Sequence, residues 1–289
     1  MSASDPSKVQ QFRERLRHEW TDEKTVAAWR KWYAHIAHFT RGATEALLEA
    51  AKLRPGMRVL DLASGVGDPA LWVAKAVGPT GHVTGTDLGP GMISLAEELA
   101  RMKGLKNIEF SEANPESLPF PDESFDVITC RFGIMFFPDQ MQALKECRRV
   151  LKPGGRVVFV AWGTKDQPFF NTTAGIILKY VQVPPPDPEA PNLFMFGERG
   201  RMRRILVAAG FADADEQVLT VPGRWKSSVE QYWEQFTEVA APFRPLVEKL
   251  TPETRAKAFG ESIAALQKYS DCRELKLPLE IVIGTGMRA

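Results

Sequence analysis

Met57-Arg-Val-Leu-Asp-Leu-Ala-Ser-Gly-Val-Gly-Asp-Pro-Ala70 is the stretch that decides the fold of this 289-residue chain. Its apolar start, residues 59–62, predicts a short buried strand, and Asp68 before Pro69 predicts a helix N-cap with proline at the first helical position. Between them lie Gly65 and Gly67, where glycine lets a backbone approach a ligand closely. Together these features predict the first strand-turn-helix unit of a nucleotide-type α/β sheet, with the ligand at the carboxyl end of the strand.

The charges around this turn indicate which ligand it suits. The spacing Gly65-x-Gly67-x-x-Ala70 also fits a dinucleotide fingerprint, in which a pyrophosphate lies on the helix N-terminus. Asp61 and Asp68 would repel a pyrophosphate, whereas both favour an ammonium or sulfonium group. Asp87 follows about twenty residues after the second glycine, where an acidic residue accepts hydrogen bonds from ribose hydroxyls. The residues therefore predict an adenosine that carries no phosphate and has a cationic tail.

Four motifs in order along the chain resemble the class I S-adenosylmethionine-dependent methyltransferases, in particular the branch of the ubiquinone and menaquinone biosynthesis methyltransferases. They cover roughly residues 45 to 165, and the two ends of the chain match only loosely. The motifs are Val59-Leu-Asp-Leu-Ala-Ser-Gly-Val-Gly-Asp68, Gly85-Thr-Asp-Leu-Gly-Pro-Gly-Met92, Glu116-Ser-Leu-Pro-Phe-Pro-Asp-Glu-Ser-Phe-Asp126 and Leu151-Lys-Pro-Gly-Gly-Arg156.

The resemblance implies S-adenosyl-L-methionine as the cofactor and assigns residues to it. Asp61 and the backbone around Ala63, Gly65 and Gly67 would hold its methionine end. Asp87 would bind the ribose hydroxyls, with Leu88 and Met92 against the adenine. Cys130, at the end of the fourth strand, would contribute its backbone carbonyl, and its thiol is expected to be inert packing.

Two departures from the family pattern bear on the site. Where this branch has Asp and a residue whose backbone N–H meets the adenine, this chain has Asn114 and Pro115, and proline has no N–H to give. Adenine binding is therefore expected to be weaker or shifted. Where many relatives place a His-His pair after the fourth strand, this chain has Met135 and Phe136. A catalytic base, if the reaction needs one, must come from elsewhere.

The N-terminal helices supply the remaining candidates. His35 and His38 lie on an aromatic helix that starts near Thr21, and a histidine suits removal of a proton from a phenol, enol or amine. A histidine beside tryptophans is more often a packing residue, and both interpretations stay open. The substrate candidates are aromatic side chains and one cation that could bind a carboxylate or enolate or form a surface ion pair: Tyr33, Arg131, Phe132 and Phe136.

The strand and helix signals alternate along the centre of the chain. Strands are expected at 59–62, 82–87, 107–111, 125–130 and 156–162, with helices at 68–77, 90–103 and 139–150, which predicts a doubly wound, mostly parallel sheet. With further strands at 216–221 and 278–284, the resemblance implies a seven-stranded Rossmann-like sheet with an antiparallel C-terminal edge strand. We divide the chain into an N-terminal helical cap (1–42), the core (43–223), a helical insertion (224–275) and the last core strand (276–289). Residues 1–8 are expected to be a disordered tail, and the proline-rich segment 183–191 a stiff extended connection.

Composition excludes several classes of function. With 37 Lys and Arg against 36 Asp and Glu, no overall field favours nucleic acid or an anionic membrane. Cys130, Cys147 and Cys272 are too few for a disulfide framework or a thiolate zinc site, so we expect a reducing compartment and no metal. No signal region and no run of ~20 apolar residues is found, so we expect a cytoplasmic protein with no integral membrane part. The oligomeric state stays open, with a homodimer as one candidate.

These observations favour methyl transfer to a small, aromatic or partly apolar acceptor, at oxygen, nitrogen or carbon, by in-line displacement. Proximity and orientation supply most of the rate in such a reaction, since well-oriented partners reach effective molarities of ~10⁵ to 10⁸ M. Two alternatives remain. One is a nucleotide-dependent oxidoreductase, which the paired carboxylates disfavour. The other is a binding protein that keeps the cofactor pocket without catalysis, which the missing His-His pair makes worth testing.

Overall fold

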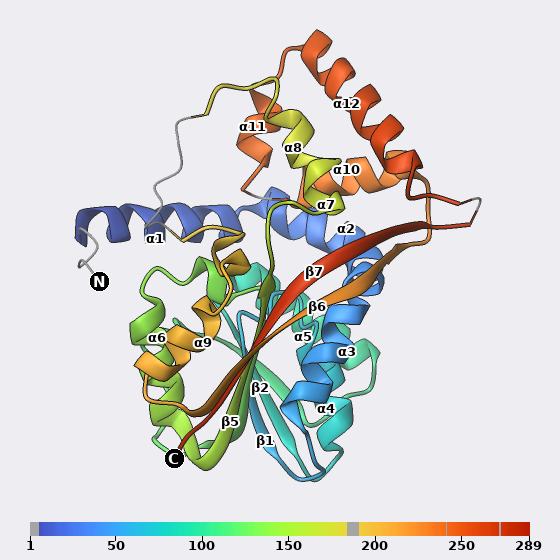
Figure 1. Cartoon of the computed structure of the whole chain (residues 1–289). Coiled ribbons are helices and arrows are strands. Elements are labelled where there is room, and N and C mark those ends of the chain that lie inside the picture. Colours follow the sequence, from blue (N-terminus) through green and yellow to red (C-terminus); the bar gives the residue numbers. More distant parts are fainter. Residues whose placement is uncertain (1–5, 184–190, 241, 272) are drawn as a thin grey trace.

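A seven-stranded sheet forms the centre of the molecule (Figure 1). The computed structural model describes residues 6–183, 191–240, 242–271 and 273–289, and its strand order is β3-β2-β1-β4-β5-β7-β6. The strands are β1 (Arg58–Leu62), β2 (His82–Asp87), β3 (Ile108–Glu112), β4 (Phe125–Arg131), β5 (Leu151–Trp162), β6 (Ala212–Trp225) and β7 (Leu275–Met287). β1 to β5 are parallel, and β7 is antiparallel to both of its neighbours, β5 and β6. The predicted doubly wound Rossmann-like sheet is confirmed.

The last two strands form a hairpin at the sheet edge; the C-terminal strand β7 is antiparallel, as expected, but lies inside β6, which is the outermost strand. β6 and β7 pair from Ala212 opposite Met287 to Trp225 opposite Leu275. Both strands are therefore longer than the predicted 216–221 and 278–284. Several of the additional residues, such as Pro222, Gly223 and Lys276, are turn-forming or polar in sequence, and they become strand because the two strands continue to pair there.

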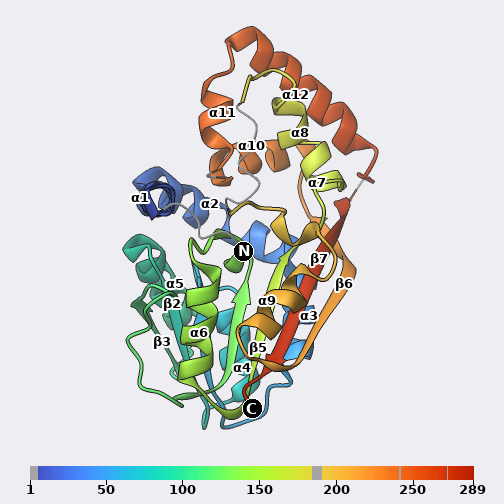
Figure 2. The ribbon, with the colours of Figure 1, turned by 60° about the vertical axis from the view of Figure 1, so that its left-hand side comes forward.

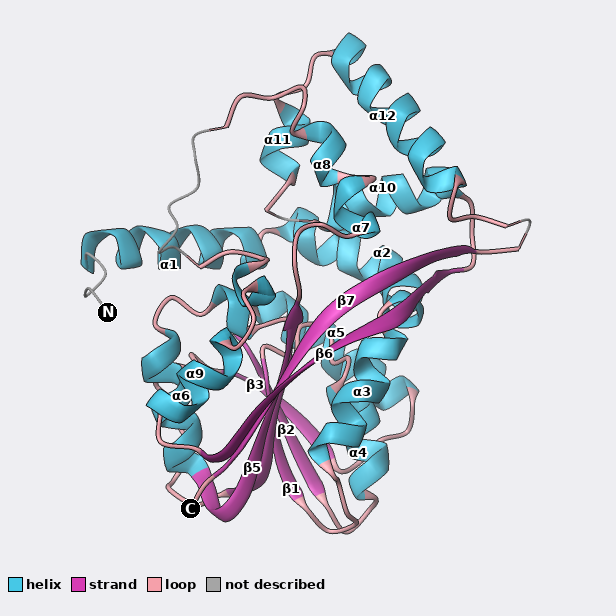
Figure 3. Cartoon of the chain, viewed as in Figure 1, coloured by secondary structure: helices cyan, strands magenta, loops and turns pink. Residues whose placement is uncertain are grey.

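Helices cover both faces of this sheet (Figure 3). α4 (Ala70–Val77) and α5 (Pro90–Met102) follow β1 and β2 on the face that also carries α3 (Arg41–Ala51), whereas α6 (Gln140–Val150) and α9 (Arg201–Ala208) cover the opposite face. The strand order reverses between β1 and β4. In such sheets the ligand binds at this point, beyond the carboxyl ends of the strands.

Five further helices pack together beyond the end of the sheet (Figure 2). They are α7 (Pro168–Asn171), α8 (Ala174–Ile177), α10 (Val229–Val239), α11 (Arg244–Glu248) and α12 (Pro252–Gln267). Trp233, Phe236 and Val247 are buried among them with Ile177 and Ala258. The segment after β5 thus shares a core with the segment between β6 and β7. The division of the chain at residues 224 and 275 stays a prediction.

The N-terminal segment consists of α1 (Pro6–Thr21) and α2 (Glu23–Phe39). α2 is capped by Asp22, whose side chain accepts from the N–H of Lys24, rather than by Thr21. The expected tail is shorter than predicted, because a helix begins at Pro6; residues 1–5 lie outside the described residues, as do 184–190 of the proline-rich connection and Cys272. Cys130 and Cys147 are buried as free thiols.

Candidate functional site

The turn between β1 and α4 adopts backbone conformations that favour glycine. Ala63, Gly65 and Gly67 have φ of 52°, 53° and 92°. A Cβ on Gly67 would lie 3.2 Å from both Ala96 Cβ and Phe110 Cζ, so glycine is needed there for close packing. A Cβ on Gly65 would meet nothing within 4 Å. Gly65 therefore leaves open space at the carboxyl end of β1, where a ligand can approach the backbone.

Asp61, on β1, is a carboxylate without solvent exposure. Its Oδ1 accepts from Thr129 Oγ1 on β4 at 2.6 Å, and its Oδ2 accepts from Ser64 Oγ at 2.8 Å. Burial raises the pKa of Asp61 to about 6, and the two hydrogen bonds limit the rise. Asp61 thus places negative charge beneath the turn, and its hydrogen bond with Ser64 connects the carboxylate to the turn.

Asp87, the last residue of β2, holds two loops by their backbones. Its Oδ2 accepts from the N–H of Gly65 at 2.8 Å, and its Oδ1 accepts from the N–H of Gly89 at 2.9 Å. Burial raises the pKa of Asp87, and these N–H groups oppose the rise. Since each carboxylate oxygen can accept more than one hydrogen bond, Asp87 can also accept from hydroxyl groups of a ligand beside Gly65.

The residues after Asp87 and after β3 border the same space. Met92 is fully buried against Val66 and Leu95, while Leu88 is partly exposed. Ala113 donates its N–H to the Asp87 carbonyl at 3.1 Å, which brings the next two residues close. Asn114 Oδ1 accepts from the N–H of Glu116 at 3.0 Å, so its amide oxygen is engaged in its own turn, and Pro115 is buried.

Asp68 does not cap α4, so that prediction is wrong. The helix begins at Ala70 with Pro69 at the cap position and has no side-chain cap. The Asp68 carboxylate instead lies 3.0 Å from Nη1 of Arg131, with 5% of its side chain exposed. The geometry is that of an ion pair rather than a hydrogen bond, and neither carboxylate oxygen has a hydrogen-bond donor among the described residues. Asp68 is therefore a buried carboxylate of the glycine turn that is paired with the Arg131 guanidinium.

Arg131, at the end of β4, is committed to contacts inside the chain. Nη1 donates to Thr40 Oγ1 at 3.0 Å and to Thr44 Oγ1 at 2.5 Å, and Nη2 donates to the Asp68 carbonyl at 2.9 Å. The guanidinium thus joins the α2–α3 junction to the glycine turn. This position explains its burial without a bound acceptor anion.

Tyr33 is a residue of α2 whose side chain reaches the glycine turn. It packs with Val66 and Met92. Burial raises the pKa of Tyr33 to about 12, and the Asp68 carboxylate adds to the rise. The phenol therefore stays protonated and can donate at physiological pH.

The two candidate histidines, one turn apart on α2, have different surroundings. The ring of His35 lies 4.9 Å from that of Trp225 and 5.6 Å from that of Trp32, and its Nδ1 is buried without a partner among the described residues. His38 lines a hollow between α2 and α4. Burial lowers the pKa of His38, and the cations Lys226 and Arg41 lower it further. Neither histidine has a described hydrogen bond to the glycine turn, and a base role for either stays a prediction.

Aromatic side chains line the region beyond β4 and β5. Phe132 stacks on Trp162 with ring centroids 4.0 Å apart, and Trp162 contacts Phe169 on α7 at 4.5 Å. Phe136 meets Trp20 of α1 edge to face at 6.1 Å. Cys130, just before this region, is fully buried, and burial raises the pKa of its thiol, which makes it inert.

Helix α1 lies across this end of the sheet (Figure 1). Arg13 forms an ion pair with Glu116, which is 5% exposed in its side chain, and Arg17 lies 3.4 Å from Glu112. Glu116 also accepts from the N–H of Asp139 at 2.8 Å. α1 is thereby attached to the loops that follow β3 and β4.

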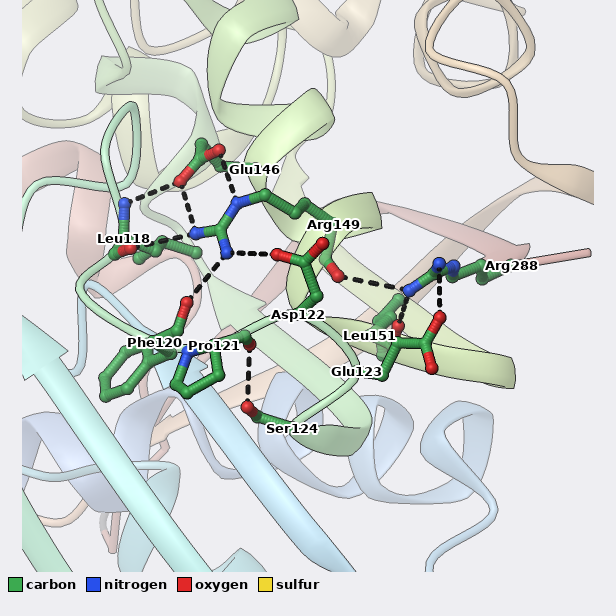
Figure 4. A network of polar contacts seen from close by, with 10 residues as sticks. All are labelled: Leu118, Phe120, Pro121, Asp122, Glu123, Ser124, Glu146, Arg149, Leu151 and Arg288. Carbon is green, nitrogen blue, oxygen red and sulfur yellow. Dashed lines mark hydrogen bonds and ion pairs between the residues drawn. The ribbon is translucent and has the colours of Figure 1, made fainter.

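The third sequence motif, residues 116–126, has a structural role (Figure 4). Arg149 of α6 donates to the carbonyls of Leu118 and Phe120 and to the Asp122 carboxylate, all at 2.8–2.9 Å. Arg288, after β7, binds Glu123 in the same network. The motif is thus tied to α6 and to the end of the chain, which fixes the loop between β3 and β4.

Several contributors were not predicted. The sequence signal for Thr129 is its position as a polar residue among Val127, Ile128 and Cys130, on the strand next to that of Asp61. Ser64 lies inside the quoted turn and binds the carboxylate from there. For Thr40, Thr44, Trp20, Trp162 and Trp225 no signal exists in one sequence, because their contacts join segments far apart in the chain.

Residues 36–182, just over half of the chain, match the ubiE/COQ5 methyltransferase family. The chain belongs to this family. A demethylmenaquinone methyltransferase from Listeria welshimeri is 36% identical over 134 residues, which are 46% of this chain and 57% of the relative. A ubiquinone/menaquinone biosynthesis C-methyltransferase UbiE from Shewanella halifaxensis is 44% identical over 112 residues, 38% of this chain and 45% of the relative. The chain thus spans about half the length of the curated relatives it matches.

The solved structure of YcgJ from Bacillus subtilis has a TM-score of 0.56 and 22% sequence identity, and the match covers 86% of this chain and 98% of that one. This similarity supports the fold. Among the described residues of this family member, no helix combines the length and apolar character needed to cross a bilayer. Within the same residues, no three His, Cys, Asp or Glu side chains gather as metal ligands.

Proposed function

We propose that this chain transfers a methyl group from S-adenosyl-L-methionine to a small aromatic, partly apolar acceptor of the hydroquinone class. One observation carries the proposal. The backbone at Gly65 borders open space and is held by Asp87, which can also accept from ribose hydroxyls; the same turn carries the buried Asp68 carboxylate, which is paired with Arg131 but lacks a hydrogen-bond donor among the described residues. This arrangement suits an adenosine with a cationic tail and opposes a pyrophosphate, so the oxidoreductase alternative is not favoured.

The residues present fit the cofactor by chemistry. Asp87 would hold the ribose, Met92 and Leu88 the adenine face, and the backbone at Ala63 and Gly65 the methionine end, with Asp68 facing its ammonium. Pro115 gives no N–H and Asn114 uses its amide oxygen locally, which supports the expected weaker hold on the adenine. When bound, the cofactor supplies a methyl group that is already activated on a cationic sulfur.

The chain's own part in the reaction is binding, orientation and exclusion of water. α1 and the aromatic side chains around Phe132 and Phe136 cover the space beyond β4, so a flat acceptor would lie in an apolar, water-poor enclosure. Alignment in such a site can supply ~7–11 kcal/mol of the barrier. Names of relatives that act on quinones support a hydroquinone, whose methylated atom would be carbon.

The acceptor must lose a proton, and His35 and His38 remain the predicted bases. A hydroquinone hydroxyl, like the phenol of tyrosine with its pKa of about 10, is almost fully protonated near neutral pH, so the step needs a base; Tyr33, protonated at that pH, can donate to the resulting anion. We assign Arg131 to holding Thr40, Thr44 and Asp68 in position, so it takes no direct part in this proton loss. The same proposal includes a metal-free site in a cytoplasmic enzyme, a small-molecule acceptor and no nucleic acid partner.

The test is turnover by the full chain with S-adenosylmethionine and an anaerobic panel of benzene and naphthalene hydroquinones, with and without an apolar tail. S-adenosylhomocysteine and methylated product are measured by mass spectrometry. We expect equal amounts of both for at least one hydroquinone. Asp87→Ala should abolish product, whereas the matched control Asp215→Ala, on the outer strand β6, should not. Cofactor binding without product across the panel would support the non-catalytic alternative.

A further inference from the structure

A hollow of about 260 Å³ lies between the N-terminal helices and α4, outside the glycine turn. Tyr33, His38 and Arg41 line it from α2 and the start of α3, and Trp72 and Lys75 line it from α4. Lys103, just after α5, also lines the hollow. The hollow therefore bridges the predicted N-terminal cap and the core.

The charged side chains of this hollow are all basic. Arg41, Lys75 and Lys103 line it together with His38, and no Asp or Glu does. Arg41 pairs with Glu45, which is half exposed and lies outside the lining. Lys75 and Lys103 have no ion-pair partner among the described residues. Since the whole chain carries a net charge of only +1, this concentration of cations is local.

An exposed indole stands among these cations. Trp72 is 42% exposed, and its ring lies 5.5 Å from Lys75 Nζ and 5.8 Å from Arg41 Cζ. Lys103 Nζ lies 5.9 Å from the ring of Tyr33. The aromatic rings orient the cations around the hollow and offer a flat apolar surface beside them.

His38 provides an independent sign that the hollow suits an anion. Its Nε2 is buried without a hydrogen-bond partner among the described residues. Burial lowers the pKa of His38, and Lys226, Arg41 and Arg224 lower it further, while Glu274 opposes them. The surroundings are thus electropositive, and an anion in the hollow would relieve the repulsion between the cations.

We propose that the hollow binds a small organic phosphate with a flat ring. Its phosphate would lie between Lys75 and Lys103, and its ring against Trp72. Lys and Arg side chains are the common phosphate partners, and an open hollow of this size suits a small ligand better than a large one.

The ligand would also connect the cap to the core. His38 and Arg41 belong to the cap, whereas Trp72, Lys75 and Lys103 belong to the core, and Tyr33 extends from the hollow to Val66 and Met92 at the glycine turn. A phosphate held from both sides would keep the cap closed over the turn. This second step rests on the proposed function, because it predicts tighter binding of the cofactor.

The binding test uses phenyl phosphate, inorganic phosphate and phenol in calorimetric titrations of the full chain. We expect phenyl phosphate to bind at least tenfold more tightly than either fragment. The double variant Lys75→Gln/Lys103→Gln should lose at least tenfold, the matched double variant Lys145→Gln/Lys268→Gln should lose nothing, and Trp72→Leu should bring phenyl phosphate to the level of inorganic phosphate. No binding by the native chain, or equal loss in both double variants, would overturn the proposal.

A phospholipid headgroup also carries a phosphate, so a separate experiment distinguishes a membrane surface from a small molecule as the ligand. Sedimentation with phosphatidylglycerol and with phosphatidylcholine vesicles distinguishes the two. We expect no capture that depends on Lys75 and Lys103. Capture by the anionic vesicles that the double variant abolishes, without affinity for phenyl phosphate, would contradict a small-molecule ligand.

The coupling test measures S-adenosylhomocysteine affinity with and without saturating phenyl phosphate. A threefold or greater gain, absent in Lys75→Gln/Lys103→Gln, supports the connection between cap and core. An unchanged affinity would overturn that connection. If S-adenosylhomocysteine does not bind at all, the proposed function fails, whereas the phenyl phosphate titrations still decide the hollow.

Discussion

The ionisation of Asp61 makes the charge of the site depend on pH. Its pKa is raised to about 6 by burial, above the ~3.9 of an exposed aspartate, so below pH 6 the folded chain holds a proton there. A cationic ligand favours the ionised carboxylate and must displace that proton at low pH. We therefore expect the affinity for S-adenosylmethionine to rise as the pH rises through about 6.

Calorimetry between pH 5 and 8 measures this dependence. Asp61→Asn, checked for native circular dichroism, should bind more weakly and lose the rise. A native affinity that stays constant across this range would contradict the assignment of Asp61 to the ligand's cationic end.

Thr129 is the neighbour that keeps Asp61 satisfied. Thr129→Val preserves the side-chain shape but leaves a buried carboxylate oxygen without its donor, which should cost about 1–3 kcal/mol of unfolding free energy. Urea denaturation measures the loss. The matched control is Thr84→Val on β2, whose Oγ1 donates to the largely exposed Glu109, and we expect a clearly smaller change there. Equal losses would show that the hydrogen bond from Thr129 to Asp61 contributes no more to the free energy of unfolding than the bond from Thr84 to Glu109.

The residue predictions succeeded where one motif carried the signal, and failed where a distant partner decided. Gly65 and Asp87 meet at the turn, as their spacing suggested. Asp68 has the sequence of a helix cap, yet it faces Arg131, which lies 63 positions further along the chain. No local pattern contains that ion pair.

At the scale of the element, we expect Gly65 of the glycine turn to matter mainly for ligand binding and Gly67 mainly for stability. Gly65→Ala adds only backbone strain, about 1–2 kcal/mol, but fills the space where a ligand would approach. Gly67→Ala adds the same strain and forces a Cβ against Ala96 and Phe110, about 2–4 kcal/mol in total. We expect Gly65→Ala to lose cofactor affinity with modest destabilisation, and Gly67→Ala to be the less stable of the two. Thermal denaturation and calorimetry measure both, and the reverse order of stability would contradict this account of the turn.

Helix α1 should depend on the buried end of its ion pair with Glu116. Glu116→Gln weakens the contacts with Arg13 and with the N–H of Asp139, so amide hydrogen exchange in α1 should become faster. Glu112→Gln is the matched control, because Glu112 is half exposed and lies 3.4 Å from Arg17. Exchange that accelerates equally in both variants, or in neither, would show that Glu116 does not anchor the helix.

Element boundaries were predicted best in the centre of the chain, where strands and helices alternate. β2 was predicted with its observed bounds, 82–87, whereas the hairpin strands were predicted too short because only pairing between them makes their ends strand. The short helices α7 and α8 gave no helical pattern of their own. α8 is stabilised by burial of Ile177 and Ala174 against helices more than fifty residues away, and α7 by burial of Phe169.

At the scale of the whole molecule, the sheet and its switch point follow from the order of strands and helices, whereas the additions around it do not. The cap meets the sheet through contacts such as Trp32 with Trp225 of β6, and it meets the helices beyond the sheet through contacts such as Asp22 with Arg244 of α11. These contacts join segments roughly two hundred residues apart. They determine the shape of the acceptor enclosure, which is why the sequence indicated the cofactor more closely than the acceptor.

The most direct test is calorimetric titration of the full chain with S-adenosylmethionine and S-adenosylhomocysteine, with NADH as the comparison. The arrangement of Asp68, Gly65 and Asp87 predicts micromolar binding of the first two, one molecule per chain, and no binding of NADH. Absence of both cofactor forms from the titration, or NADH binding as tightly as they do, would contradict the central claim.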